Sequence, residues 1–581
     1  MTDKTKSRTR ILIILILAVV AGLIYLLSIF FAHPIFQNTR LIDPLAEMNS
    51  LFPLYYVAIS LTALLGIGCF LWRIENKYLH ILLLSMFAVM LWFTPYYLAG
   101  FVRLPDGPWH VGVALQIPQV LGGDPVAFSG YAWSFPGSFI YHYTFLNILG
   151  MEPTAYISTV FPLLCLLLFV LLCYVLVARL FSHKVAFLSM LIAIPGLHYI
   201  QLHPSPHTIG ALLMLTALLL LTRRGAAAKV IAIMAIIVIV ISHPTTPLLL
   251  SIFLAAALLT SIVYSRRIGR TQVALASILI ICFVGWFSWY SFYPASPPAQ
   301  VAAPEEPAAW GGRAGWLYQR LTPGELEGAQ GYLTGTPFIY PNIHNLNKGI
   351  YFLYAAAAIL GILSIAARTY SQQRSIRKWI SNLGGLNQSQ ALMIVSVLLL
   401  LLLTFLLAEV AHDLIETGLT FIVLALSCII ASAIAHSHWI NKKIVPSFLM
   451  VGVLFLTLSF PIVAYSIDAY SSFPESEEAG LKFLATSVPL DEKAIATNSA
   501  PQLALYLESP PNQTEFVSPY PEMQPDLVVF RNTGYYYAAM RYDLSFEDNR
   551  FTEYLAMVES NKYDKIYSTS TFDIYSTDKD K

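Results

Sequence analysis

The chain has 581 residues, of which 57% are hydrophobic and 12% charged, and its formal net charge is +1. This balance excludes an ordinary soluble globular protein and indicates an integral membrane protein. The near-zero net charge also excludes a nucleic-acid-binding surface, because such a surface needs an excess of Lys and Arg. All five cysteines fall within apolar runs, so neither disulfides nor a cysteine metal site is expected.

The first predicted element is an apolar run at 11–31, which follows four basic residues. It has the roughly 20 residues that span a bilayer, and no small-residue cleavage site precedes His33, so we expect a retained helix rather than a signal peptide. Further uncharged segments bring the prediction to about thirteen transmembrane helices. They lie at 52–72, 79–96, 155–179, 185–202, 206–222, 229–243, 245–264, 271–293, 349–367, 390–409, 414–435 and 445–467.

Basic residues mark every second connection between these segments, which is the pattern of cytoplasmic loops. With an odd number of helices, this pattern predicts a multi-pass plasma-membrane protein with a cytoplasmic N-terminus and an extracytoplasmic chain after about Ile467. The basic connections carry Arg73 and Lys77; Arg179 and Lys184; Arg223, Arg224 and Lys229; Arg266, Arg267 and Arg270; Arg368, Arg374, Arg377 and Lys378; and Lys442 and Lys443.

The fold class that follows is mainly α: a transmembrane domain at 1–470 and a small extracytoplasmic α/β domain at 475–581. Two long outer loops, at 97–153 and 294–348, belong to the transmembrane domain. In the first loop, helical spacing of apolar positions at 108–121 and 135–149 predicts two helices lying at the membrane surface. In the C-terminal domain, β-prone runs at 493–497, 527–530 and 565–568 alternate with helix-like runs at 501–508 and 550–559.

The first outer loop contains the sequence Arg103-Leu-Pro-Asp106-Gly-Pro-Trp-His110. The Asp106 carboxylate could act as general base on an acceptor hydroxyl, or hold a divalent cation such as Mg²⁺ or Mn²⁺, with His110 one turn further on in support. The alternative is that Asp106 is simply the N-cap of the next helix, with Pro108 in its first turn. Those roles are compatible.

Asp124 is a second acidic candidate for a metal ligand in the same loop. It stands in a Gly-Gly-Asp-Pro sequence, which is common turn chemistry, and the turn is the favoured reading. The short acidic stretch at 409–416 could share one helix face and bind a cation, or be a solvated turn.

A His-Pro sequence lies at a predicted helix end in each of two short outer turns, His203-Pro-Ser-Pro-His207 and Ser242-His243-Pro-Thr-Thr. His207 and His243 are candidates for contact with the phosphate of a lipid-linked donor. No regular ligand spacing supports a metal here, so helix-end capping or headgroup contact is favoured over coordination.

A phosphate-linked lipid would need positive charge on the outer side, where Arg and Lys are few. The candidates are Arg40, Arg103, Arg313, Arg320 and Lys348, of which Arg313 and Arg320 lie in the second long loop, and a plain surface role is the default for each. The sequence contains no P-loop, no dinucleotide fingerprint and no G-x-S-x-G elbow, which disfavours nucleotide-driven pumping and serine hydrolysis.

The chain resembles the GT-C family of membrane glycosyltransferases, in particular its archaeal members. It lacks the Trp-Trp-Asp signature of oligosaccharyltransferases and the Asp-Glu pair of protein mannosyltransferases, so the acceptor is not assigned. The resemblance rests on Leu104-Pro-Asp106-Gly-Pro-Trp-His110, Ser134-Phe-Pro-Gly137, the turns at 203–207 and 242–244, and the closing 561–567 and 574–575.

The resemblance implies inverting transfer of a sugar from a polyprenyl-phosphate carrier on the extracytoplasmic side, with Asp106 as the base. The expected partners are the lipid-linked donor, membrane lipids and a glycan, lipid or protein acceptor. Two alternatives stay open: a transporter or flippase of lipid-linked glycans, and a catalytically inactive membrane scaffold. A transporter should carry mid-helix charges and internal repeats, and the apolar segments here show neither.

Overall fold

Helices make up most of the described chain, because apolar segments in hydrocarbon must satisfy their backbone N–H and C=O groups internally. The computed structural model describes residues 3–39, 49–99, 106–122, 132, 134–197, 202–223, 225–265, 269–292, 341–373, 386–407, 412–436, 444–465 and 475–487, and five strands between 494 and 576.

Nine helical stretches in the described residues are long and apolar enough to cross a membrane. Each coincides with a predicted segment. They are formed by α1 (Asp3–Thr39), α3 (Pro53–Leu71), α4 (Lys77–Ala88) with η1 (Val89–Phe93) and α5 (Thr94–Ala99), α10 (Pro153–Ala155) with η2 (Tyr156–Val160) and α11 (Phe161–Leu180), α15 (Thr246–Ser265), α16 (Arg270–Phe292), α19 (Pro341–Gln373), α22 (His412–His436) and α23 (Ile444–Ala464).

Four shorter apolar helices occupy the remaining predicted positions, so every predicted segment has a counterpart in the structure. The prediction of a polytopic, mainly helical membrane protein is confirmed. The shorter helices are α12 (His183–Ala193) with η3 (Ile194–Gly196), α13 (Pro206–Leu221), α14 (Ala226–Ser242) and α21 (Gln388–Leu407).

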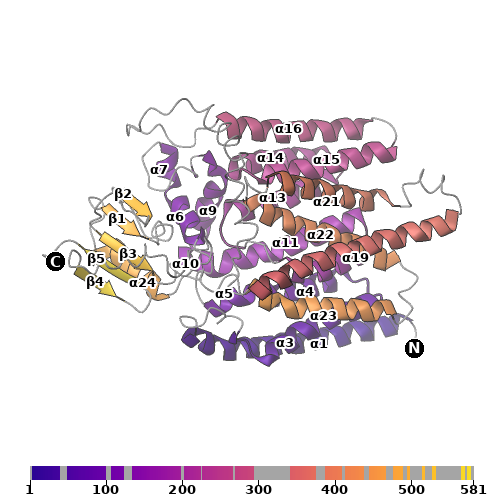
Figure 1. Cartoon of the computed structure of the whole chain (residues 1–581), viewed down its shortest axis with the longest axis horizontal. Coiled ribbons are helices and arrows are strands. Elements are labelled where there is room, and N and C mark those ends of the chain that lie inside the picture. Colours follow the sequence, from indigo (N-terminus) through magenta and orange to yellow (C-terminus); the bar gives the residue numbers. More distant parts are fainter. Residues whose placement is uncertain are drawn as a thin grey trace.

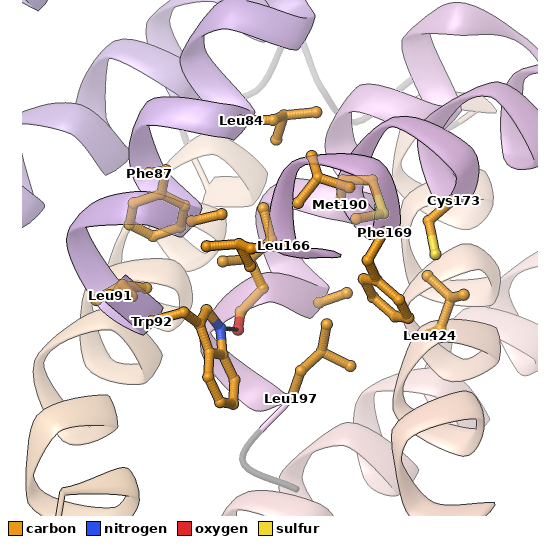
Figure 2. Close-up of a cluster of buried hydrophobic side chains, with 14 of the residues drawn as sticks. Leu84, Phe87, Leu91, Trp92, Leu166, Phe169, Cys173, Met190, Leu197 and Leu424 are labelled. Carbon is orange, nitrogen blue, oxygen red and sulfur yellow. Dashed lines mark hydrogen bonds between the residues drawn. The ribbon is translucent and has the colours of Figure 1, made fainter. Parts of the chain in front are cut away.

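The interior of the helical bundle is filled by side chains from elements far apart in sequence. Figure 2 shows α4 and η1 meeting α11, with α12 and α22 closing the cluster. The indole of Trp92 is 4% exposed, and its Nε1 donates to the backbone oxygen of Ile194 at 3.3 Å. The labelled residues of this cluster are Leu84, Phe87, Leu91, Trp92, Leu166, Phe169, Cys173, Met190, Leu197 and Leu424.

Two of the spans contain a π-helical turn, η1 and η2, which hydropathy does not predict. A π turn inserts one residue into the helix and leaves carbonyls to be satisfied by other groups. In η1, the hydroxyls of Tyr55 and Thr94 both donate to Met90 O, at 3.0 and 2.6 Å. Tyr25 in turn bonds Thr94 Oγ1 at 3.0 Å. These bonds fix the helix end that leads through α5 into the first outer loop.

The C-terminal region contains a five-stranded sheet of order β2-β1-β3-β5-β4. β1 (Ala494–Thr497) is parallel to β2 (Gln513–Phe516) and β3 (Leu527–Arg531), whereas β5 (Phe572–Ser576) is antiparallel to β3 and to β4 (Asp564–Ser568). β1, β3 and β4 overlap the predicted β-prone runs. β2, β5 and α24 (Glu475–Ser487) were not predicted, and the helix-like runs at 501–508 and 550–559 lie outside the described residues.

The two ends of the helical bundle differ in what they carry (Figure 1). The sheet, α24 and the short helices α6 (Asp106–Leu115), α7 (Ile117–Gly122), α9 (Pro136–Leu149) and α10 lie at one end, and the N-terminus lies at the other. At the N-terminal end the guanidinium of Arg10 lies over the ring of Trp72, and Lys184 lies over Phe70. Lys184, from one of the predicted basic connections, therefore lies at the end opposite the sheet. That the basic end faces the cytoplasm stays a prediction.

Candidate functional site

Three short helices of the first outer loop lie beyond the ends of the spanning helices (Figure 1). They are α6 (Asp106–Leu115), α7 (Ile117–Gly122) and α9 (Pro136–Leu149). The single helix expected over 108–121 is broken at Gln116, because Pro118 lacks an N–H and is favoured only in a helix's first turn. The second surface helix begins one residue later than predicted and ends where predicted.

Two close backbone contacts bring distant motifs together. At Gly107, near the start of α6, a Cβ would lie 3.1 Å from Ile157 Cγ2 and 3.5 Å from Pro204 Cδ. At Gly137, near the start of α9, a Cβ would lie 2.4 Å from Ser242 Oγ. The Asp106 sequence therefore packs on the His203 turn, and the Ser134-Phe-Pro-Gly137 sequence packs on the Ser242 turn.

Histidine rings from α6, α9 and the two His-Pro turns lie close together where these elements pack. The rings of His110 and His203 are 6.2 Å apart between centroids and nearly parallel, with 21° between their planes. The rings of His207 and His243 are 5.4 Å apart. His142 of α9 bonds the hydroxyl of Tyr156 through Nδ1 at 2.8 Å. We call these five residues, His110, His142, His203, His207 and His243, the histidine cluster.

The two His-Pro turns cap the helices that follow them. Ser205 Oγ accepts from Thr208 N at 3.2 Å, and Thr208 Oγ1 donates to His203 O at 3.0 Å. In the other turn, His243 Nδ1 accepts from Thr246 N at 3.3 Å, at the start of α15. An accepting Nδ1 in a neutral imidazole leaves the proton on Nε2. The capping alternative is therefore realised in both turns, and His243 keeps an Nε2–H.

Four helices begin around the cluster, namely α6, α9, α13 and α15. The first turn of a helix exposes N–H groups without intrahelical partners and carries a partial positive charge. The four motifs at 106–110, 134–138, 203–207 and 242–246 contain neither Lys nor Arg. This place therefore attracts anions through backbone dipoles rather than through charged side chains.

Burial keeps three imidazoles of the cluster uncharged at neutral pH. Burial, followed by the neighbouring His203, His142 and His243, holds the pKa of His110 well below its usual range. Burial lowers the pKa of His142 to about 3. Burial, followed by His207, holds the pKa of His243 well below its usual range. These imidazoles can donate or accept one hydrogen bond per nitrogen but do not carry positive charge.

Among the described residues, the buried polar atoms without a hydrogen-bond partner include His110 Nδ1, Ser138 Oγ and His142 Nε2. Buried polar atoms are nearly always satisfied, so an unsatisfied group calls for water or a ligand. Ser138 was not singled out from the sequence. The only signal for it was its position directly after the Ser134-Phe-Pro-Gly137 motif.

The other predicted site residues are only partly described. Asp106 is the first residue of α6, and its side chain lies outside the described part of the structure. Arg103, Asp124, Arg313 and Arg320 also lie outside it, as do the side chains of the 409–416 stretch. Among the side chains that are described, no three His, Cys, Asp or Glu residues are arranged to hold a metal ion.

The predicted metal, Mg²⁺ or Mn²⁺, prefers oxygen ligands. The described cluster supplies imidazoles and hydroxyls, so its donor set does not fit such an ion. Of the predicted ligands, only the carboxylates of Asp106 and Asp124 would suit it.

This arrangement defines a polytopic membrane protein with a buried polar site where four helices begin. The sequence matches no protein-family model and no curated protein. The structure is similar to that of archaeal oligosaccharyltransferase AglB from Archaeoglobus fulgidus, in complex with an inhibitory peptide and a dolichol-phosphate, with 13% identity and a TM-score of 0.48 over 87% of this chain and 74% of that chain.

Two further structures are similar. ArnT from Cupriavidus metallidurans bound to undecaprenyl phosphate has 12% identity and a TM-score of 0.46, over 86% of this chain and 98% of that chain. The Archaeoglobus fulgidus oligosaccharyltransferase in complex with Zn and sulfate has 14% identity and a TM-score of 0.43, over 86% and 73%.

Both proteins are GT-C glycosyltransferases, the family that the loop motifs resemble. With identities of 12 to 14% and TM-scores below 0.5, these likenesses carry no further argument about this chain, and no residue's role follows from them.

Proposed function

We propose that this protein is a membrane glycosyltransferase that moves a sugar from a polyprenyl-phosphate-linked donor to an acceptor on the extracytoplasmic side. The observation that carries the proposal is the convergence of four motifs, distant in sequence, on one polar place at the ends of the spanning helices. A donor with a long apolar carrier can reach such a place from within the bilayer. An acceptor can reach it from water.

The chemistry assigned to the site separates two tasks. Asp106 takes the proton from the acceptor hydroxyl as the acceptor oxygen bonds the anomeric carbon of the sugar. The bond between that carbon and the donor phosphate breaks, and its electron pair leaves with the phosphate. His110 stands four residues after Asp106, on the same face of α6, and supports it as a neutral hydrogen-bond partner.

The negative charge that appears on the leaving phosphate needs stabilisation. The starts of α13 and α15 supply N–H groups and dipoles, and His207 and His243, one at each start, have rings 5.4 Å apart. Because burial disfavours the charged form of His243, its contribution is the Nε2–H as a neutral donor. Arg103, Arg313 and Arg320 are proposed as further contacts to the donor phosphate.

The test is sugar transfer from a panel of polyprenyl-phosphate sugars by the full-length protein in proteoliposomes. Wild type should transfer sugar from at least one donor. Asp106→Asn should lose roughly 10²-fold or more in rate, the usual contribution of a general base. The matched control is Glu152→Gln, because Glu152 is an exposed carboxylate of the same outer region, outside the cluster. It should retain the wild-type rate.

Other results would contradict the proposal. Equal rates for wild type and Asp106→Asn would remove Asp106 as the base. Movement of lipid-linked sugars across the bilayer without transfer would favour a flippase. Wild-type binding of donor with neither activity would favour a scaffold. Adding EDTA and then Mg²⁺ or Mn²⁺ to the same assay tests the divalent cation separately.

A further inference from the structure

A second polar site lies at the other end of the bundle, in a groove between α4, α11 and the start of α12. Its volume is about 470 Å³. α11 begins at Phe161, whose ring lies 5.1 Å from that of His142 in the histidine cluster, and ends near Arg179 in the groove. At 1.5 Å per residue, the helix separates the two sites by about 30 Å. The groove is therefore distinct from the proposed active site.

Among the described residues, three basic side chains line the groove: Lys77, Arg179 and His183. No described Asp or Glu lines it, although Glu75 lies in the connection just before α4. Within the described chain, neither Lys77 nor Arg179 forms an ion pair, and the Lys77 ammonium lies 5.0 Å from the ring of Tyr78. The groove therefore holds positive charge that its own walls do not neutralise.

Two helix N-termini add to this charge. Asn76 Oδ1 caps α4 by accepting from Tyr78 N at 3.0 Å and Leu79 N at 3.2 Å. Ser182 Oγ caps α12 by accepting from Val185 N at 3.2 Å. Each cap fixes a helix start whose dipole has its positive end at the groove.

A chain of hydrogen bonds holds the wall of the groove in place. His80 Nε2 contacts Ile74 O at 2.7 Å, and since a carbonyl only accepts, that nitrogen carries a proton. Burial favours the neutral form of this ring, whose Nδ1 then accepts from the hydroxyl of Tyr174 at 3.2 Å. The Tyr174 oxygen in turn accepts from His183 Nδ1 at 3.1 Å. This order of donors turns His183 Nε2 away from Tyr174.

The remaining wall of the groove is apolar and continues along the spanning helices. Ile81, Val175 and Ala178 supply it. Next to it, Leu82 and Leu171 expose 49% and 37% of their surface, as side chains facing lipid do. Positive charge at the end of a span, above an apolar wall, matches a molecule with a phosphate head and hydrocarbon tails.

We propose that this groove binds the phosphate headgroup of an anionic membrane lipid in the leaflet opposite the histidine cluster. Arg179 and Lys77 pair with the phosphate oxygens, and the tails lie along Ile81 and Val175. The site does not depend on the proposed transferase activity, and the lipid is not the sugar donor, because the sites lie at opposite ends of α11.

Native mass spectrometry of the full-length protein in detergent tests this, with phosphatidylglycerol and phosphatidylcholine of identical chains as probes. Wild type should retain one phosphatidylglycerol with at least a fivefold preference over phosphatidylcholine. Lys77→Gln with Arg179→Gln should abolish the preference. Lys77→Arg with Arg179→Lys should keep it, which separates charge from misfolding.

The matched control is Arg223→Gln with Lys229→Gln, which removes one Arg and one Lys at the same end of the protein but outside the groove. It should keep the preference. An equal loss in the control pair would mean diffuse surface charge and would overturn the site. Displacement of the lipid by inorganic phosphate at equal concentration would identify a free-phosphate site and overturn the lipid assignment.

Discussion

The hydroxyl oxygens of Tyr55 and Tyr465 lie 2.8 Å apart, although the residues are separated by 410 positions in the chain. Both side chains are almost fully buried. Tyr465 donates to Leu91 O, and the Tyr55 proton is shared between Met90 O at 3.0 Å and the Tyr465 oxygen. Two tyrosines thus satisfy two carbonyls of the π turn η1 and tie α3 and α23 to it.

Tyr465→Phe should destabilise the protein by about 1 kcal/mol, because Leu91 O and the Tyr55 oxygen lose a partner inside the bundle. The measurement is unfolding in mixed micelles with increasing SDS, followed by tryptophan fluorescence. The end of α4 should also become more accessible to hydrogen exchange, since the bonds that close η1 are weakened.

Tyr78→Phe is the control for this change. It removes the same hydroxyl from a side chain that is 73% exposed. Its unfolding curve should coincide with that of wild type. If Tyr465→Phe also coincided with wild type, the buried hydroxyls would contribute no net stability.

The order of the spanning helices could be predicted from sequence because length and lack of charge are read along the chain. Every apolar segment has its helix, and Pro136–Leu149 lies almost where it was expected. Which helices pack against one another could not be predicted, because the hydropathy of a segment does not depend on which helix it contacts. The contacts of Tyr55 with Tyr465 and of His110 with His203 are of this kind.

The candidate site divides in the same way. The His-Pro turns were predicted to lie at helix ends, since proline and a capping residue mark helix starts. The meeting of the Ser242 turn with the start of α9 depends on Gly137, where a Cβ would overlap Ser242 Oγ, and the His203 turn lies close to Gly107 at the start of α6. From the sequence alone, a glycine that allows two backbones to pack closely cannot be distinguished from a glycine that allows a turn.

His243 has two roles that substitution can separate. His243→Asn should keep the cap of α15, because Asn Oδ1 can take the position of the accepting Nδ1, but it lacks an Nε2–H. His243→Ala should lose both and unfold about 1 kcal/mol more easily. If the Nε2–H contacts the donor phosphate, both variants should lose at least tenfold in transfer rate.

Stability and transfer rate are therefore measured on both variants. Wild-type activity in His243→Asn together with reduced stability in His243→Ala would leave only the capping role. Reduced activity in His243→Ala alone would mean that the turn, rather than the imidazole proton, is needed.

The buried histidines make stability depend on pH. The folded-state pKa values of His110, His142 and His243 lie below the unfolded value of about 6.5. Their contribution to the unfolding free energy is fully present above pH 6.5 and is lost as the pH falls. Below pH 6.5 the unfolded chain binds protons at these histidines, whereas the folded chain does not. Each histidine should lower the unfolding free energy by roughly 1.4 kcal/mol per pH unit in that window.

Thermal unfolding between pH 7.5 and 5 measures this effect. In the folded protein the pKa of His142 is about 3, so the effect of this ring on stability continues below pH 5. His142→Gln removes this titrating ring. The slope of stability against pH below 6.5 should be smaller in the variant by one proton. Equal slopes in wild type and variant would mean that the imidazole of His142 is charged in the folded protein.

Gly137→Ala should disturb the site without removing any polar group. Its Cβ would lie 2.4 Å from Ser242 Oγ and 3.3 Å from the backbone carbon of Ile241, so α9 must move away from the His243 turn. We expect at least a tenfold loss of transfer and a lower unfolding temperature. Gly68→Ala is the control, because nothing lies within 4 Å of its added Cβ and alanine favours a helix interior by up to about 1 kcal/mol. Equal activity in the two variants would show that transfer tolerates separation of α9 from the Ser242 turn.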